Sequence, residues 1–211
     1  DFVDVDSEKW RQYADSARPP LSWVYAREAR TLLAYERRIA ASFSRTLFVS
    51  QSEAALFAAR APETANRVGH LSNGVDADYF DPDRQLPDPY PPGGPVIVFT
   101  GAMDYRPNVE AVSWFAEAIL PRIARQRPDA RFWIVGNRPS RTVLELRKRE
   151  GVTVTGWVPD VRPYLGHASV VVAPLRIARG LQNKVLEALA MARPVVCTTA
   201  AADGIDPEGR H

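Results

Sequence analysis

The sequence predicts an α/β protein whose second half is a Rossmann-like, doubly wound parallel sheet. Two observations carry this prediction. After residue 95, short apolar runs alternate with segments of helical periodicity, and the runs are apolar along their whole length. Strands of this kind are buried on both faces, as in a parallel sheet that is covered by helices on both sides. Ligands of such folds bind at the carboxyl ends of the strands.

The elements of this second half follow one another in a regular order. We expect strands at 96–101, 130–136, 152–156, 169–175 and 194–199. The predicted helices cover 107–126, 140–150 and 180–192, with a short helical or turn segment at 160–168. Pro107 falls in the first turn of the first helix, where proline is tolerated because that N–H has no helical partner.

The first 80 residues have the pattern of the end of another Rossmann-like domain. Ser7 is expected to cap a helix that runs to Ala17, and Pro19-Pro20 ends it. A long helical pattern extends from Trp23 to Phe43. Its apolar stripe is formed by Val24, Leu32, Tyr35, Ile39 and Phe43.

Strands and a linker complete this first part. A strand tail is expected at 1–6 and a strand at 46–50, followed by a helix capped by Ser52. A further short strand runs into an Asn-Gly turn within 67–76. The stretch 81–95 is dense in proline and glycine. We therefore predict the end of a first domain at 1–80, a linker at 81–95 and a second domain at 96–211, truncated at its end.

Composition excludes several classes of protein. The chain is 45% hydrophobic and 25% charged, as in an ordinary globular protein, and its net charge of +2 does not indicate a nucleic-acid partner. There is no run of 18 apolar residues and no signal peptide pattern. The single cysteine, Cys197, is expected to be a buried small residue. Because the histidines His70, His167 and His211 stand alone in the sequence, we expect no metal site.

Glycine follows three of the predicted strands at the edge where ligands bind. Gly101, Gly136 and Gly156 occupy these positions. Glycine lets a ligand approach the backbone, although glycine also ends strands in many α/β proteins without any ligand. Neither GxGxxG nor GxxxxGK[ST] occurs, so nicotinamide dinucleotide binding and a P-loop lack their motif.

The segment 179–196 begins with a polar, glycine-containing turn and continues as a helix. On a helix that starts near Gly180, Lys184 and Glu187 share one face with that glycine. The helix N-terminus and Lys184 suit a diphosphate, and Glu187 can accept two hydrogen bonds from a vicinal diol such as that of ribose. The alternative is a Lys184–Glu187 surface pair, worth only about 0.3 kcal/mol.

Several segments together resemble a known family. They are GLQNKVLEALAMARPVV at 180–196, GWVPDVRPYLGHASVVVAPL at 156–175, LSNGVDADYF at 71–80, FTGAMDYRPNVEAVSWF at 99–115 and FWIVGNRPS at 132–140. They resemble the GT-B retaining glycosyltransferases of bacterial group 1 (family 4 type), which build cell-surface glycans. DFVDVDSEKW at 1–10 and REARTLLAYERR at 27–38 are similar to the sugar transferases of PEP-CTERM/exosortase exopolysaccharide systems.

The resemblance implies a role for each matching residue. Glu187 would hold the ribose of the donor, and Trp157 and Val158 would meet the base. Gly101 would lie near the diphosphate and Gly136 beside the nucleotide. The turn that includes Gly180 and Asn183 would face the phosphates and the sugar, together with Lys184.

Two departures from the family pattern concern charge. Arg179 stands where the family usually has an acid, and Ala102 and Asn108 stand where it usually has a basic pair. The charge that neutralises the leaving diphosphate would then fall to Lys184 or Arg179, the two catalytic candidates, in preference to Arg138 or Arg106.

The activity implied is glycosyl transfer with retention from a UDP- or GDP-linked sugar, without a metal or other cofactor. The implied acceptor is a cell-surface glycan or a lipid-linked molecule, and the implied location is the cytoplasm, with peripheral contact at the inner face of the membrane. The first residue is not methionine, and the family's glycine-rich acceptor loop is absent. We expect a fragment that alone binds nucleotide weakly and turns over poorly or not at all.

Other functions remain open at this point. A nucleotide-sugar epimerase on the same architecture would need acids and histidines around the sugar. A non-catalytic nucleotide-sugar-binding module would fit the missing partners at 102, 108 and 179. A purely structural domain would leave Lys184 and Glu187 at the ligand edge without a purpose.

Overall fold

The computed structural model describes residues 1–205, so His211 lies outside the described residues. The contacts divide the chain into two units. The first holds Asp1–Asn73, Ile177–Gln182 and residues 202–205, and the second holds Gly74–Arg176 and Asn183–Ala201. The proline-rich stretch 81–95 belongs to the second unit and forms no regular element there.

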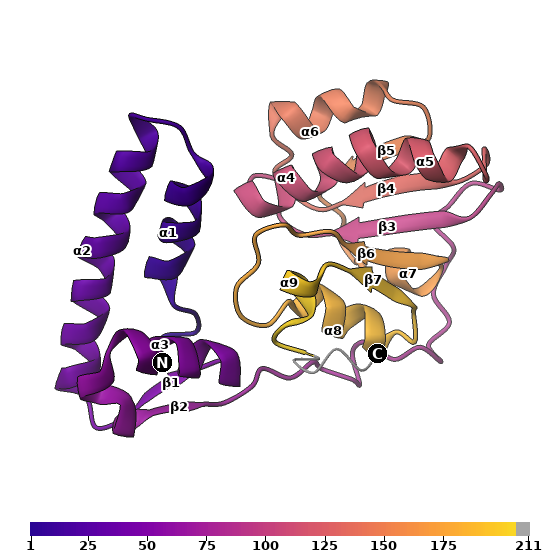
Figure 1. The fold of residues 1–211 in the computed structure, drawn as a ribbon. Coiled ribbons are helices and arrows are strands. Elements are labelled where there is room, and N and C mark those ends of the chain that lie inside the picture. Colours follow the sequence, from indigo (N-terminus) through magenta and orange to yellow (C-terminus); the bar gives the residue numbers. More distant parts are fainter. Residues whose placement is uncertain (206–211) are drawn as a thin grey trace. The chain divides into compact units, whose positions relative to one another are not determined.

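The second unit is built on a parallel five-stranded sheet, which confirms the predicted fold class (Figure 1). Its strands are β3 (Val96–Thr100), β4 (Arg131–Val135), β5 (Val152–Gly156), β6 (Val170–Ala173) and β7 (Val195–Cys197). They lie in the order β5-β4-β3-β6-β7, and every pair is parallel. The strand order reverses between β3 and β6, so this fold places its ligand crevice at the carboxyl ends of these two strands.

Helices follow the strands as the sequence predicts, with different boundaries. They are α4 (Arg106–Trp114), a π-helical segment (Phe115–Ile119), α5 (Leu120–Ala124), α6 (Arg141–Glu145), a 3-10 turn (Leu146–Lys148), α7 (Arg162–Gly166), α8 (Asn183–Ala190) and α9 (Thr199–Ala202). The single helix predicted at 107–126 remains helical from Arg106 to Ala124, but its hydrogen bonds take the π-helical pattern between Phe115 and Ile119. Pro121 lies just after this π-helical segment.

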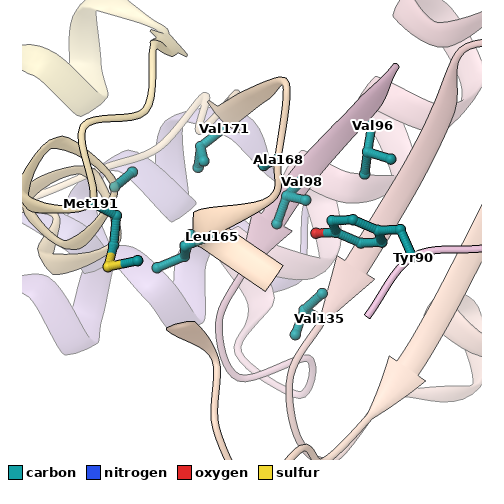
Figure 2. Close-up of a cluster of buried hydrophobic side chains, with 9 residues drawn as sticks. Tyr90, Val96, Val98, Val135, Leu165, Ala168, Val171 and Met191 are labelled. Atoms are coloured by element: carbon teal, nitrogen blue, oxygen red, sulfur yellow. The ribbon is translucent and has the colours of Figure 1, made fainter. Parts of the chain in front are cut away.

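The sheet buries side chains on both of its faces. On one face, residues of β3, β4 and β6 pack with residues in or just after α7 and α8 (Figure 2). These residues are Val96, Val98, Val135, Val171, Leu165, Ala168, Ala188 and Met191, with Tyr90. On the other face, Phe132 packs at 4.5 Å, centroid to centroid, on Phe115 of the π-helical segment. Alternation along β4 explains why neighbouring residues serve opposite faces.

The first unit contains two short parallel strands and three helices (Figure 1). Its elements are α1 (Asp6–Ser16), α2 (Leu21–Ser42), β1 (Thr46–Phe48), α3 (Gln51–Arg60), a 3-10 helix (Pro62–Arg67) and β2 (Val68–His70). The expected strand tail at 1–6 amounts to one bridge, from Val3 to Phe48. Phe48 and Phe57 form the centre of a small core, with ring centroids 5.0 Å apart.

Both helix caps predicted in this unit are wrong. Ser7 does not cap α1, whose N-cap is Val5. The Ser7 hydroxyl instead donates a hydrogen bond to Glu36 at 2.6 Å. Ser52 does not cap α3, because Ser50 takes that place and accepts a hydrogen bond from the backbone N–H of Glu53. Glu36 is far from Ser7 in sequence, so spacing does not reveal that contact. Ser50 and Glu53, in contrast, have the spacing of a capping box, a sequence signal that favours Ser50 over Ser52.

The apolar stripe predicted for α2 is only partly buried, because Leu32 and Ile39 are half-buried and its other three members are exposed. Val24 and Tyr35 are about half exposed, at 52% and 51%, and Phe43, just past the helix end, is 60% exposed. The buried positions of α2 are Glu36 and Ala40. The periodicity predicted the helix correctly but not the side that packs.

Two smaller expectations need correction in the second unit. Cys197 at the end of β7 is partly rather than fully buried. The helical spacing also predicts Leu181, Val185 and Leu189 on the packing side of α8; Val185 is buried there, but Leu189 is 49% exposed. Within residues 1–205, no helix is long and apolar enough to cross a membrane.

Candidate functional site

Lys184 lies in the first turn of α8 and reaches the end of β3. Its Nζ donates a hydrogen bond to Asn108 Oδ1 at 2.7 Å, and it lies 4.2 Å from the centroid of the Phe99 ring. Asn108 belongs to the first turn of α4. Since α8 follows β6 and α4 follows β3, Lys184 joins the two strand ends that flank the topological switch point.

The charge of Lys184 is not neutralised by a neighbour. No carboxylate among residues 1–205 lies within 4.0 Å of its Nζ. Burial lowers the pKa of Lys184 to about 8, and the charge of Glu187 partly opposes that shift. A desolvated ammonium without a carboxylate partner is a favourable place for an anion.

Glu187 follows Lys184 in α8 without pairing with it. Because no ion pair forms between the two, the alternative of a simple surface pair fails. Burial raises the pKa of Glu187, and the Lys184 charge acts in the opposite direction. In the described part of the chain no donor contacts this carboxylate, and neither of its oxygens is fully enclosed, so both remain open to hydroxyl donors.

Gly101 leaves the space that the lysine contact needs. A Cβ at this position would lie 2.8 Å from Asn108 Nδ2 and 3.2 Å from Lys184 Nζ. Asn108 Nδ2 also donates to Ala102 O at 2.9 Å. Glycine at 101 is therefore required by the arrangement of Asn108 and Lys184, whether or not a ligand approaches it.

Gly136 has a packing reason of its own. A Cβ there would come within 1.7 Å of the carbonyl oxygen of Gly101. The carboxyl ends of β3 and β4 thus approach so closely that only glycine fits. Gly156 differs, because its φ of +77° favours glycine although nothing lies within 4 Å of a Cβ.

The other predicted donor-binding residues of the second unit are more exposed. Arg138, with φ +49°, pairs with Asp104 at 3.1 Å and is 70% exposed. Trp157, at the end of β5, is 72% exposed, whereas Val158 packs against the core cluster. An exposed indole beside the strand ends is available for stacking on a planar ring.

Arg179 and Gly180 belong to the first unit by their contacts. Arg179 Nη2 lies 2.7 Å from Glu53 Oε1, and the other Glu53 oxygen accepts from the backbone N–H of Val5 at 2.7 Å. Gly180 has φ +59°, and a Cβ there would meet Asp4 Oδ1 at 1.8 Å. The structure thus groups this segment with α3 and the start of the chain.

The predicted start of the helix at Gly180 is wrong. The left-handed φ of Gly180 cannot continue a helix, and α8 begins only at Asn183. Lys184 and Glu187 remain on this helix as predicted, but Gly180 does not share their face. Asn183 is the first residue of α8 and is exposed.

Sequence reasoning missed three residues near the site. Asn108 was noted only as a departure, Phe99 only as part of a strand, and Arg176 not at all. Arg176 follows the end of β6, is exposed and lies 5.8 Å from the centroid of the Trp114 ring. Its place directly after an apolar strand is a signal that could have identified it. Among the described residues, no group of three or more His, Cys, Asp or Glu side chains could hold a metal ion.

The second unit thus has a Rossmann-like fold, a fold whose ligands commonly bind at a topological switch point. A family model described as "Glycosyl transferases group 1" matches residues 94–211, which is 118 of 211 residues. The chain belongs to this family. A comparison with curated proteins gave no match.

Solved glycosyltransferase structures share this fold. A glycosyltransferase from Rickettsia africae ESF-5 has 15% identity and a TM-score of 0.64, covering 92% of this chain and 59% of its own. WaaG, a glycosyltransferase involved in lipopolysaccharide biosynthesis, has 17% identity and a TM-score of 0.65, covering 90% and 54%. HepE of Anabaena, in complex with UDP and glucose, has 16% identity and a TM-score of 0.61, covering 82% and 49%. The chain therefore spans roughly half of the length of these proteins.

Proposed function

We propose that this chain carries the nucleotide-sugar side of a glycosyltransferase that uses a UDP- or GDP-linked donor. The observation that carries the proposal is the Lys184 ammonium, held at the end of β3 beside the switch point without a carboxylate partner among the described residues. Membership of the group 1 glycosyl transferases supports it. So do the structures of HepE with UDP and with UDP-glucose.

In this proposal Lys184 donates hydrogen bonds to the diphosphate. Negative charge develops on the nucleoside diphosphate as its bond to the sugar breaks, and a preorganised ammonium stabilises that charge most in the transition state. We assign this role to Lys184 rather than to Arg179, because Glu53 already engages the Arg179 guanidinium. Arg176 is a further candidate for the same charge.

The remaining contacts of the donor are proposals that rest on the family resemblance. Glu187 accepts hydrogen bonds from the ribose hydroxyls, and Trp157 stacks on the base with Val158 beneath it. The backbone at Gly101 and Gly136 borders the nucleotide. Asn183, the first residue of α8, faces the phosphates and the sugar in this proposal, whereas Gly180 groups with the first unit and is left out.

The finer features of the reaction are proposals from the family resemblance. The transfer proceeds with retention and without a metal cofactor, and its acceptor is a cell-surface glycan or a lipid-linked molecule. Exopolysaccharide synthesis of the PEP-CTERM/exosortase type is the proposed setting. The proposed location is the bacterial cytoplasm, with peripheral contact at the inner face of the membrane.

Calorimetric titration with UDP and with GDP tests the proposal. One nucleotide is expected to bind, and Glu187→Ala is expected to weaken it about tenfold or more, because hydrogen bonds to a charged acceptor contribute about 1.5–3 kcal/mol. Glu150→Ala, an exposed glutamate of the same unit, is the matched control and should leave affinity unchanged. A folded protein that binds neither nucleotide at millimolar concentration would contradict the proposal.

A non-catalytic nucleotide-sugar-binding module is the second candidate. It is favoured because two of the other candidate cations already have carboxylate partners. Arg138 pairs with Asp104, and Arg106 pairs with Glu110. One ammonium would then have to stabilise the leaving group with little help. Release of free UDP or GDP from the bound nucleotide sugar, in the presence of acceptor, distinguishes the enzyme from the module.

A further inference from the structure

The amide of Asn108 holds the Lys184 ammonium at one place. Asn108 is only 6% exposed, and both ends of its side chain are engaged. Nδ2 donates to Ala102 O at 2.9 Å, so Oδ1 must face the lysine, from which it accepts at 2.7 Å. The amide is therefore fixed by the backbone that follows β3, and the lysine is fixed by the amide.

The partner of Lys184 is neutral, and this has a chemical consequence. A carboxylate in the same position would cancel the lysine charge and compete with any anion for it. An amide oxygen accepts one of the three N–H donors and leaves the charge and the other two donors available. Holding the side chain in advance also removes part of the rotamer entropy that a free lysine loses on binding.

From these contacts we infer that Asn108 is a positioning residue, which holds the Lys184 ammonium ready for the diphosphate of the donor. The inference rests on the proposed function, because it takes the anion to be that diphosphate. The positive charge at the end of β3 comes from Lys184 on α8, across the switch point. The residue on α4 that holds it, Asn108, is neutral. Gly101 is part of the same arrangement, because any Cβ at this position would collide with the Asn108 amide.

Exchange of the two side chains tests this inference. Lys184→Asn should weaken UDP and inorganic pyrophosphate about tenfold or more, since it removes a charge-assisted hydrogen bond. The double variant Asn108→Lys/Lys184→Asn returns an ammonium to the same place from the opposite helix and should regain most of that loss. A side chain with a purely structural role would not be rescued by this exchange.

Asn108→Asp supplies the second arm of the test. The new carboxylate should weaken UDP binding about tenfold or more and raise the pH at which Lys184 loses its proton. The only lysines of the chain are Lys9, Lys148 and Lys184, so the Lys184 side chain can be followed by NMR titration. Gln126→Glu, an exposed amide-to-carboxylate change in the turn before β4, is the control.

The outcomes separate this inference from the proposed function. Rescue by the exchange, with loss in Asn108→Asp, supports the positioning role. If the native chain binds UDP but neither Asn108 variant changes affinity or the lysine titration, the inference is overturned and the proposed function stands. If the native chain, shown to be folded, binds neither UDP nor pyrophosphate, the proposed function fails and this inference falls with it. Circular dichroism and thermal unfolding establish that each variant is folded.

Discussion

At the scale of single residues, the cations considered for the phosphate differ in what they already contact. Three arginines have carboxylate partners; these pairs are Arg106–Glu110, Arg138–Asp104 and Arg179–Glu53. Lys184 contacts a neutral amide and an aromatic ring instead. An anion can engage Lys184 without first breaking an ion pair. Within residues 1–205, Arg176 shares this property but is exposed and contacts only the Trp114 ring, whereas Asn108 holds Lys184 in place, so we prefer Lys184.

The titration of Lys184 predicts how nucleotide affinity depends on pH. The folded pKa is lowered from 10.5 to about 8, so the ammonium is present below about pH 8 and is lost as the pH rises. UDP affinity should therefore be nearly flat below about pH 7, drop to about half at about pH 8 and then fall by up to about tenfold per pH unit. Titrations at a series of pH values check this, and Lys184→Met should abolish the fall. An unchanged pH profile in Lys184→Met, with Lys148→Met as control, contradicts the prediction.

The contact between Gly136 and Gly101 predicts a stability effect. Gly136→Ala should lower the free energy of unfolding by about 3 kcal/mol, because its Cβ would lie 1.7 Å from the Gly101 carbonyl oxygen and must separate β3 from β4. Gly74→Ala, where nothing lies within 4 Å, should change stability by less than about 0.5 kcal/mol. Urea unfolding measures both, and equal effects would show that the strand ends are not packed as described.

At the scale of elements, the sequence predicts those parts whose signal is local. All five residues of β3 are buried, so its continuous apolar run identified a central parallel strand directly. The start of α8 could not be found this way, because Gly180 has a left-handed φ and packs so closely on Asp4, far away in sequence, that a Cβ would lie 1.8 Å from its Oδ1. The contact between Asn108 and Lys184 spans 76 residues, and no periodicity encodes it. Residue types at the site were predictable, whereas their partners were not.

The N-terminus of α3 gives a prediction about a single element. Ser50→Ala should destabilise the first unit by about 1 kcal/mol, since Ser50 accepts a hydrogen bond from the Glu53 N–H and is almost fully buried. Ser52→Ala, two residues later in the chain, should lower the free energy of unfolding by less than about 0.5 kcal/mol. Thermal unfolding measures the stability of both variants. A larger loss in Ser52→Ala than in Ser50→Ala would identify Ser52 as the cap.

At the scale of the whole molecule, the candidate site separates by unit. Lys184, Glu187, Gly101 and Gly136 lie in the second unit, whereas Arg179 and Gly180 group with the first. The segment 177–182 is thus continuous in sequence with α8 but is held by contacts to Glu53 and Asp4. The sheet, which was predicted from its apolar strands, explains why the residues of the second unit lie at strand ends. The grouping of Arg179 and Gly180 with the first unit results from tertiary contacts alone.

This division predicts where nucleotide protects the backbone from hydrogen exchange. Saturating UDP, at about 100 times its Kd, stabilises the binding-competent state by about 2.7 kcal/mol. Protection should rise at 101–108 and 183–187, because these segments carry the Asn108–Lys184 contact and Glu187, and should stay unchanged in α1 and α2. Exchange followed by mass spectrometry with and without UDP measures this, with Lys184→Met as the variant that loses the effect. Protection confined to α1 and α2 would place the nucleotide on the first unit and would refute a donor site at the switch point.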